Sequence, residues 1–248
     1  MGDHPKRVPG RALRWALAGL VTLLLAAGAI RAGIYLVYAA RMFTFPLEAH
    51  QLESKMVLLA YRAQTGLPLY PEWRDYPHVA NFFAPVDFLL VGGIGRLVGA
   101  DIRGLFLIGR AVSFAAWMIE VVVLGVWAAR RYGPFAGLFG AVLTLSSIAM
   151  TGFSVSTRPD MLAELLGVVG FILCGERSRG RRVAGVAALV LAALTKQTAG
   201  VYLIAAALAA VAEGRRRWAL AILGGGLGAI ALIVAAVTLA VEPNFARS

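Results

Sequence analysis

Long apolar stretches that alternate with short basic clusters dominate this sequence. The stretches are roughly 16 to 25 residues long, about the length that an α-helix needs to cross the hydrocarbon core of a bilayer. Only helices or closed barrels can cross it, and these stretches are continuously apolar rather than alternating, which favours helices. The sequence therefore predicts an all-α integral membrane protein, in keeping with its 60% hydrophobic residues.

Many of the basic residues behind the net charge of +11 lie in four clusters, each between apolar stretches or before the first. Loops rich in Lys and Arg stay in the cytoplasm, where they also face anionic lipids. We therefore interpret the charge as a signal of membrane topology and expect no nucleic acid as a partner. The clusters lie at residues 6–14, 130–131, 177–182 and 215–217.

Positive-inside counting predicts about seven transmembrane helices, with a cytoplasmic basic tail at residues 1–14. The first span, residues 15–37, is expected to be an uncleaved anchor. A signal peptide is the alternative, although Arg31 interrupts its cleavage context. A long extracytoplasmic loop (38–103), six further spans (104–241) and an extracytoplasmic tail (242–248) follow. The six spans are predicted at residues 104–129, 134–152, 161–175, 183–194, 198–212 and 218–241.

The long first loop is predicted to contain two interfacial helices. Residues 48–64 carry apolar side chains at helical spacing and end at Gly66 and Pro68. Such a segment favours an amphipathic helix that lies along the membrane surface. Residues 85–98 are apolar but short and glycine-rich, which favours a second interfacial helix. If they crossed the membrane instead, there would be eight spans and Arg130 would lie outside.

Glu48 stands directly after the first span and is our first catalytic candidate. A carboxylate at the mouth of a helical bundle can act as a general base or a metal ligand. A plain alternative is that Glu48 only interacts with the N-terminus of the following helix.

A second group of candidates lies at the outer ends of the later spans. Arg158 and Lys196 are strong cations on the same predicted side, and the two together suit a lipid phosphate or pyrophosphate. Asp160 opens a predicted span and is a catalytic candidate beside Arg158, whereas helix capping is its simpler interpretation. For Arg158 and Lys196 the simpler interpretation is snorkelling or pairing with Asp160. Gln197 follows Lys196 and can hydrogen-bond a substrate hydroxyl. Glu164, one turn beyond Asp160, should be paired or face a polar cavity.

The loop adds further candidates for substrate binding, namely Asp75, Tyr76 and His78. Its aromatic residues form either an interfacial belt or a platform for sugar rings or an isoprenoid chain. Two residues inside apolar stretches are interpreted as structural. Cys174 is expected to fill space in the packing, and Glu120 to form one half of an internal ion pair. The aromatic group consists of Tyr70, Trp73, Tyr76, Phe82 and Phe83.

Several motifs resemble membrane-embedded glycosyltransferases of GT-C fold, which include the protein O-mannosyltransferases and the bacterial lipid A aminoarabinose transferase. The resemblance is carried by Phe-Pro-Leu-Glu at 45–48, Gly-Leu-Pro-Leu-Tyr at 66–70, the aromatic and proline stretch at 76–85, Gly-Arg-Ala-Val-Ser at 109–113 and Arg-Pro-Asp at 158–160. It extends loosely over nearly the whole chain. Because the family's shared core has about seven helices and whole enzymes usually add more, the chain is expected to be incomplete, divergent or partial.

The resemblance implies an inverting transfer of a sugar from a polyprenyl-phosphate donor to an acceptor lipid, glycan or protein outside the cytoplasm. Glu48 would be the base or would help to hold a divalent cation, the one cofactor considered. Arg158 and Lys196 would stabilise the departing phosphate. The expected location is the inner (plasma) membrane of a bacterium, with the site facing the periplasm or exterior.

Two other functions remain open at this stage. A multi-pass transporter or flippase would move a lipid-linked or small polar substrate, although no internal repeat is evident. A non-catalytic assembly subunit would bind partners without turnover. An acceptor-transfer assay separates the three.

Overall fold

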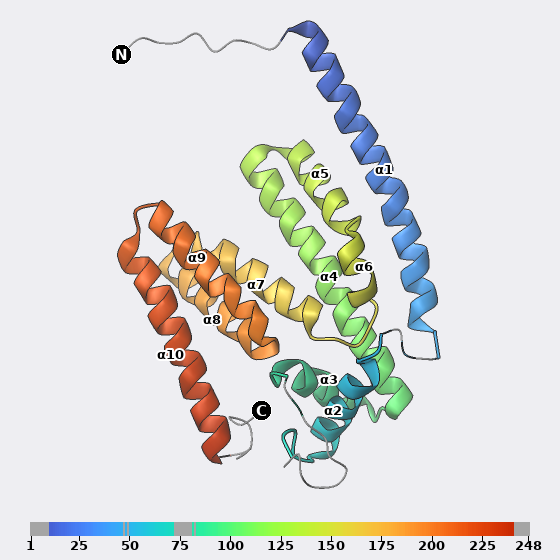
Figure 1. The fold of residues 1–248 in the computed structure, drawn as a ribbon, viewed down its shortest axis with the longest axis vertical. Coiled ribbons are helices and arrows are strands. Elements are labelled where there is room, and N and C mark those ends of the chain that lie inside the picture. The colour runs from blue at the N-terminus through green and yellow to red at the C-terminus, as the bar shows by residue number, and fades with distance from the viewer. Residues whose placement is uncertain (1–9, 47, 49, 72–80, 82, 241–248) are drawn as a thin grey trace.

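The computed structural model describes residues 10–46, 48, 50–71, 81 and 83–240, and every regular element within these residues is a helix (Figure 1). The all-α fold class is therefore confirmed for this part of the chain. The helices are α1 (Arg11–Phe43), α2 (Glu53–Thr65), α3 (Val86–Val98), α4 (Ile102–Tyr132), α5 (Pro134–Leu145), α6 (Ile148–Phe153), α7 (Asp160–Cys174), α8 (Arg179–Thr195), the 3-10 helix η1 (Gln197–Gly200), α9 (Val201–Ala212) and α10 (Arg216–Ala240).

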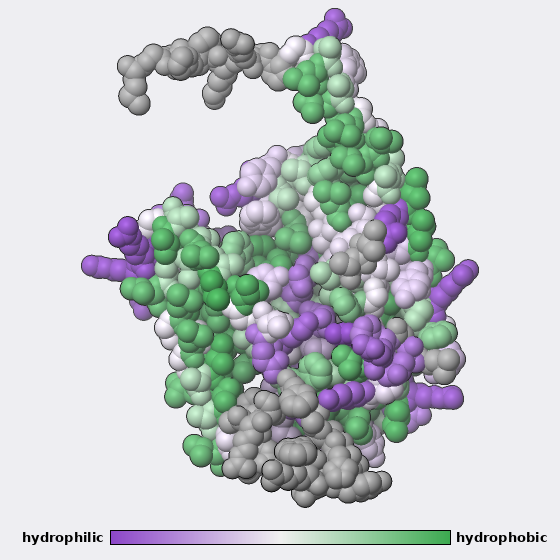
Figure 2. All heavy atoms as spheres, viewed as in Figure 1, coloured by the Kyte–Doolittle hydropathy of each residue, from purple (hydrophilic) through white to green (hydrophobic). Residues whose placement is uncertain are grey.

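Three helices, α1, α4 and α10, are long and apolar enough to cross a membrane. Large apolar side chains stand exposed along the outer two, such as Leu23 and Ile30 on α1 and Leu232 and Leu239 on α10. Exposed apolar surface on this scale is unfavourable in water but compatible with lipid. Figure 2 shows the apolar surface of α10 and of α1 on either side of a more hydrophilic centre. These helices indicate a membrane protein in a lipid bilayer.

The other four predicted spans coincide with helices that are shorter than a bilayer crossing requires. The predicted span at residues 134–152 is divided at Ser146 and Ser147 into α5, of 12 residues, and α6, of 6 residues. The helices α7, α8 and α9 have 15, 17 and 12 residues, against about 20 for a full crossing. Three spans are thus supported by length and composition, and the count of seven stays a prediction.

Close backbone contacts hold the short helices together. A Cβ on Gly170 of α7 would lie 2.7 Å from the Leu189 side chain of α8, and one on Gly185 of α8 would lie 2.7 Å from the backbone nitrogen of Cys174. Small residues of this kind let membrane helices approach closely. Cys174 itself is buried in the apolar core between α7, α8, α9 and α10, as its packing interpretation predicts.

The two helices predicted in the first loop are present as α2 and α3. They pack against each other across Gly92, where a Cβ would meet the Ala60 carbonyl oxygen at 2.4 Å. The helix α2 begins at Glu53, five residues later than predicted, and ends at Gly66, whose φ of 74° lies in the left-handed region that favours glycine. Both helices lie at the N-terminal end of α4, the lower end in Figure 1. Their placement along a membrane surface stays a prediction.

Candidate functional site

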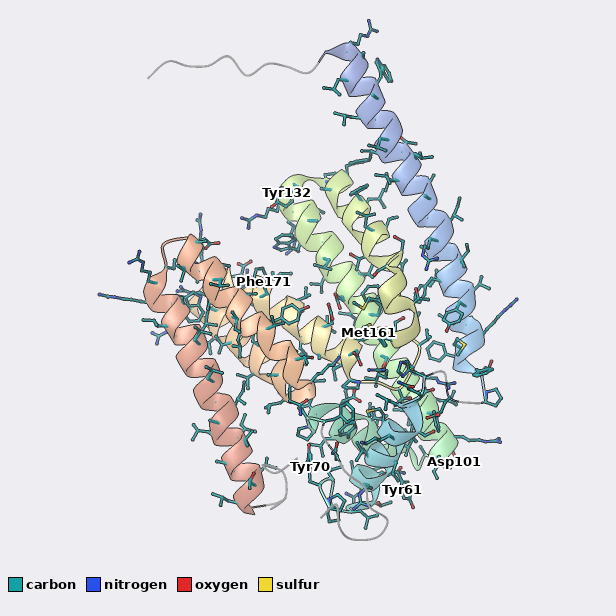
Figure 3. All side chains as sticks on the ribbon, viewed as in Figure 1. Tyr61, Tyr70, Asp101, Tyr132, Met161 and Phe171 are labelled. Carbon is teal, nitrogen blue, oxygen red and sulfur yellow. The ribbon has the colours of Figure 1, made fainter. Side chains whose placement is uncertain are left out.

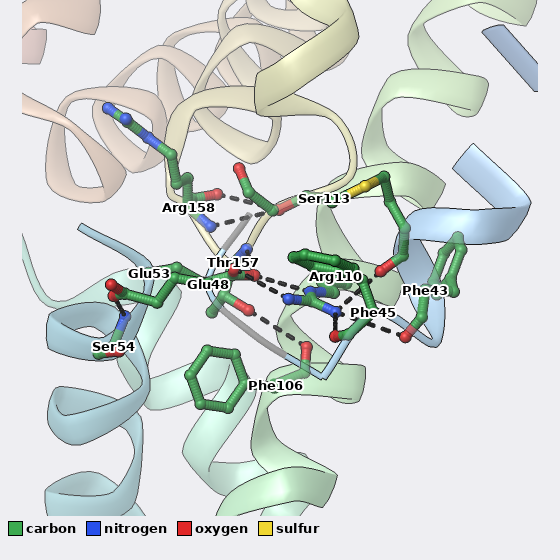
Figure 4. A network of polar contacts seen from close by, with 12 residues as sticks. Phe43, Phe45, Glu48, Glu53, Ser54, Phe106, Arg110, Ser113, Thr157 and Arg158 are labelled. Atoms are coloured by element: carbon green, nitrogen blue, oxygen red, sulfur yellow. Dashed lines mark hydrogen bonds and ion pairs between the residues drawn. The ribbon is translucent and has the colours of Figure 1, made fainter. Parts of the chain in front are cut away.

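A buried ion pair joins α2 to α4 at this end of the molecule. Arg110 of α4 donates to both carboxylate oxygens of Glu53 at 2.8 and 3.0 Å (Figure 4). The same guanidinium donates through Nη1 to the carbonyl oxygens of Met42 and Phe45 at 2.8 and 2.7 Å. Because both side chains are almost fully buried, at 2% and 0% exposure, the pair fastens the end of α1 to α2 and α4. We call Glu53 and Arg110 the clamp.

The clamp also holds the segment that leads into α7. The backbone N–H of Thr157 donates to Glu53 Oε1 at 2.8 Å. Gly109, next to Arg110, makes room for the Thr157 side chain, since a Cβ there would lie 2.2 Å from Thr157 Cγ2. The hydroxyl of Ser113 donates to the Arg158 carbonyl oxygen at 3.1 Å. The backbone on both sides of the Thr157–Arg158 peptide bond is therefore anchored to the clamp and to α4.

Arg158, Asp160 and Lys196 lie together directly beyond this anchor, and we call them the cation cluster. Arg158 Nε donates to Asp160 Oδ2 at 2.9 Å, and Lys196 Nζ donates to Asp160 Oδ1 at 2.6 Å. Asp160 is the first residue of α7, whereas Lys196 caps the end of α8. His50 completes the group, with its ring nitrogens 2.9 and 3.0 Å from Arg158 Nη1. The structure thus brings Arg158 and Lys196, which the sequence assigned to one phosphate site, together with Asp160, a catalytic candidate. Both cations pair with Asp160, which is the simpler alternative named for them.

The cation cluster carries two positive charges against one negative charge. Burial raises the pKa of Asp160, but the hydrogen bond from Lys196 and the charges of Arg158 and Lys196 outweigh it and lower that pKa below its ordinary value. Asp160 is therefore a carboxylate at neutral pH and a weak base. The side chains of Arg158, Asp160 and Lys196 are 12%, 11% and 31% exposed, so the cluster is open on the lysine side.

Asp87 is a third carboxyl group in this region, and the sequence reasoning missed it. It lies in the first turn of α3 and is 2% exposed. Burial and the nearby charge of Asp160 raise its pKa from 3.8 to about 7. Within the described part of the chain, no hydrogen-bond or ion-pair partner contacts its carboxyl group. An acid inside the apolar stretch at 85–98 was the available signal, because such residues are costly unless they serve a function.

Glu48 lies in the same part of the chain but has a different immediate role. Its Oε1 accepts a hydrogen bond from the backbone N–H of Ser54, in the first turn of α2. This is the helix N-terminal contact named as the plain alternative. Among the described residues, no hydrogen bond or ion pair joins Glu48 to the cation cluster.

The remaining candidates are placed only in part. Gln197 opens η1 directly after Lys196, whereas Asp75, Tyr76 and His78 lie outside the described residues, as do Trp73 and Phe82. Tyr70, labelled in Figure 3, is buried and donates its hydroxyl to the Phe83 carbonyl oxygen at 2.7 Å, so it forms core rather than a surface for sugar rings. No group of three or more His, Cys, Asp or Glu side chains in the described ranges could hold a metal ion.

Comparison with known proteins gave no match, whether with family models, curated proteins or solved structures. The resemblance to GT-C glycosyltransferases stays an expectation from the sequence motifs.

Proposed function

We propose that the protein is a membrane glycosyltransferase that takes its sugar from a polyprenyl-phosphate donor. The observation that supports this most directly is the cation cluster, where Arg158 and Lys196 share a single carboxylate. An arginine fork matches the oxygens of a phosphate, and a lysine adds a compact charge. The donor phosphate would replace water on the open side of Lys196, with the lipid chain in the bilayer beside the short helices.

The proposal includes the topology that positive-inside counting predicts. The chain would cross the inner membrane of a bacterium about seven times with its N-terminus in the cytoplasm. Both α2 and α3 would then lie at the outer surface, over the cation cluster. The short helices α7, α8 and α9 would end inside the protein, below the membrane surface.

Three carboxyl groups compete for the role of general base in this scheme. Asp160 is occupied by two cations, and Glu48 accepts the α2 backbone hydrogen bond. Asp87 has the property that a base needs near neutral pH, since its pKa is raised to about 7. We therefore assign the base to Asp87, with Glu48 as the alternative that the sequence resemblance implies.

The transfer would be a single displacement at the anomeric carbon of the sugar. Asp87 takes the proton of the acceptor hydroxyl, whose oxygen forms the new bond to that carbon. The bond from carbon to the phosphate oxygen breaks, and the electron pair leaves with the lipid phosphate. Arg158 and Lys196 stabilise the charge that develops on this phosphate. Inversion at the anomeric carbon follows from one displacement.

Proteoliposomes with a radiolabelled polyprenyl-phosphate sugar test this function. The expected result is transfer or hydrolysis with release of polyprenyl phosphate, lost in Lys196→Ala and kept in Arg181→Ala, whose side chain pairs with Glu176 on the surface. Movement of intact donor across the bilayer would identify a flippase instead. Donor that is neither consumed nor moved would favour an assembly subunit. An EDTA arm tests the divalent cation.

A further inference from the structure

Three helices bring two carboxyl groups and a phenol together away from the cation cluster. Glu120 lies near the middle of the long apolar helix α4, Glu164 on α7 and Tyr202 on α9. The Tyr202 hydroxyl donates to Glu164 Oε1 at 3.1 Å. Glu120 lies within electrostatic range of both other residues. We call Glu120 and Glu164 the carboxyl pair.

Close contact between α7 and α9 fixes the tyrosine. A Cβ on Gly167 would lie 2.4 Å from a ring carbon of Tyr202, so the ring rests directly on the α7 backbone. Gly167 and Glu164 are three residues apart and share one face of α7. The ring is therefore directed along that face, and its hydroxyl reaches the carboxyl group one turn away.

Glu120 has one oxygen for which the surrounding residues provide no partner. Its side chain is 3% exposed, and Oε2 is fully buried without a hydrogen bond among the described residues. The ion pair expected for Glu120 from the sequence is absent from the described part of the chain. A buried carboxylate without a partner is costly, and a second carboxylate nearby increases that cost.

Basic side chains are distant from the pair along its own helices. Arg110 and Arg130 are each ten residues from Glu120 on α4, which corresponds to about 15 Å along a helix axis. Arg110 is committed to the clamp, and α5, which packs along α4, has no charged residue. Arg31 of α1 donates to the Ser146 carbonyl oxygen. On α7, the nearest charge to Glu164 is Asp160, itself an anion, and α8, which packs on α7, carries its charged residues only in its first turn.

We propose that Glu120 and Glu164 together bind one exchangeable proton, which they share between α4 and α7. The proton removes one of two negative charges that lie within electrostatic range of each other, and it supplies a donor for the buried Glu120 oxygen. The Tyr202 hydroxyl stabilises the charge that remains on Glu164. Loss of the proton would leave two anions within electrostatic range of each other on α4 and α7, which pack together. The site does not depend on the transfer reaction proposed above.

Infrared spectroscopy of the protein in lipid vesicles tests this through the carbonyl stretch of protonated carboxyl groups. We expect such a band near neutral pH, where exposed carboxyl groups have ionised, and we expect Glu120→Gln to remove one part of it. Asp87→Asn removes a separate part, which identifies the Asp87 contribution. Glu176→Gln is the matched control, because Glu176 is an exposed surface glutamate, and it leaves the band unchanged.

Two further variants shift the titration in opposite directions. Tyr202→Phe deletes the hydrogen bond to the Glu164 anion, so the band persists to higher pH, by about one pH unit. Glu164→Gln deletes the repulsion between the carboxyl groups, so the band disappears at lower pH. The proposal is overturned if no band near neutral pH depends on Glu120, or if Tyr202→Phe and Glu164→Gln titrate as the wild type does. Because the Tyr202 variant keeps both glutamates, it provides the test even if Glu120→Gln fails to fold.

Discussion

The clamp and the cation cluster both pair basic side chains with a carboxylate and are joined through Thr157 and Arg158, yet they differ in charge balance and in exposure. Glu53 and Arg110 form one acid with one cation, both buried, and the guanidinium also donates to carbonyl oxygens of the chain. The cation cluster has two cations for one acid and is open beside Lys196. Balanced charge without access to water suits a structural joint. Surplus charge with access to water suits an anion-binding site.

The number of hydrogen-bond donors left for a ligand also distinguishes the clamp from the cation cluster. A guanidinium has five N–H donors, and Arg110 directs them to Glu53 and to carbonyl oxygens at the end of α1. An ammonium has three N–H donors. Lys196 directs one of them to Asp160, and its side chain is partly exposed. Lys196 can therefore donate a hydrogen bond to a phosphate oxygen while the contacts between the helices stay in place. The same ligand at Arg110 would require the clamp to open.

Removing one partner of the clamp should have the largest effect on stability. Glu53→Gln leaves a buried guanidinium without its counter-charge, and we expect the free energy of unfolding to fall by about 3–5 kcal/mol. Thermal unfolding in detergent measures the change. The double variant Glu53→Leu with Arg110→Met should recover much of the loss, because no buried charge remains. A melting temperature unchanged by Glu53→Gln would mean that the clamp does not hold the helices.

Asp87→Asn should change stability in the opposite direction above neutral pH. The pKa of Asp87 is raised from its ordinary 3.8 to about 7 in the folded protein, so the folded state binds a proton that the unfolded chain releases, and stability falls as the pH rises from about 4 to 7. The asparagine variant lacks this loss and should be more stable above pH 7, by an amount on the order of 1–4 kcal/mol. Melting temperatures over this pH range measure the difference, and parallel profiles for the two proteins would refute it. Loss of transfer in the same variant would support its role as base.

Gly109→Ala tests how the clamp is connected to the segment before Arg158. The new methyl group would lie 2.2 Å from Thr157 Cγ2, so the segment must move, at a cost of about 1–3 kcal/mol. Gly224→Ala in α10 is the matched control, because no atom lies within 4 Å of its added Cβ. Thermal unfolding of both variants checks the prediction. Equal stability of the two would mean that Gly109 is not needed for the contact.

His50→Ala should have the smallest effect of the series. Arg158 loses one neighbour but keeps its ion pair with Asp160. We expect polyprenyl phosphate to bind roughly two- to fivefold more weakly, the equivalent of one modest hydrogen bond. A binding titration in detergent measures this. A much larger loss would show that His50 contacts the ligand itself.

The sequence predicted the cation cluster because topology alone places its members. Arg158, Asp160 and Lys196 each stand at an end of an apolar stretch, and positive-inside counting assigns these ends to one side of the membrane. The clamp could not be found in this way. Glu53 and Arg110 are 57 residues apart, and their pairing depends on how α2 packs on α4. The sequence predicts that Glu53 and Arg110 lie on helices, but it does not show how α2 and α4 pack against each other.

Hydropathy predicted where the helices lie, whereas the number of membrane crossings stays a prediction. The predicted spans at 15–37, 104–129 and 218–241 are parts of the three long apolar helices. The predicted span at 134–152 is divided at Ser146 and Ser147, whose side chains compete with helical hydrogen bonds. Asp87 was overlooked because one acid in an apolar stretch hardly changes its hydropathy. Its importance comes from its burial near Asp160, which is a property of tertiary structure.

Binding of polyprenyl phosphate, with no sugar and no acceptor present, tests most directly whether the cation cluster holds a lipid phosphate. We predict saturable binding to the wild type and at least roughly tenfold weaker binding to Lys196→Ala, since hydrogen bonds to charged groups contribute about 1.5–3 kcal/mol. Arg181→Ala, at an exposed ion pair, should bind as the wild type does. Equal affinity of wild type and Lys196→Ala, with both proteins folded, would contradict the assignment of this cluster as the donor site.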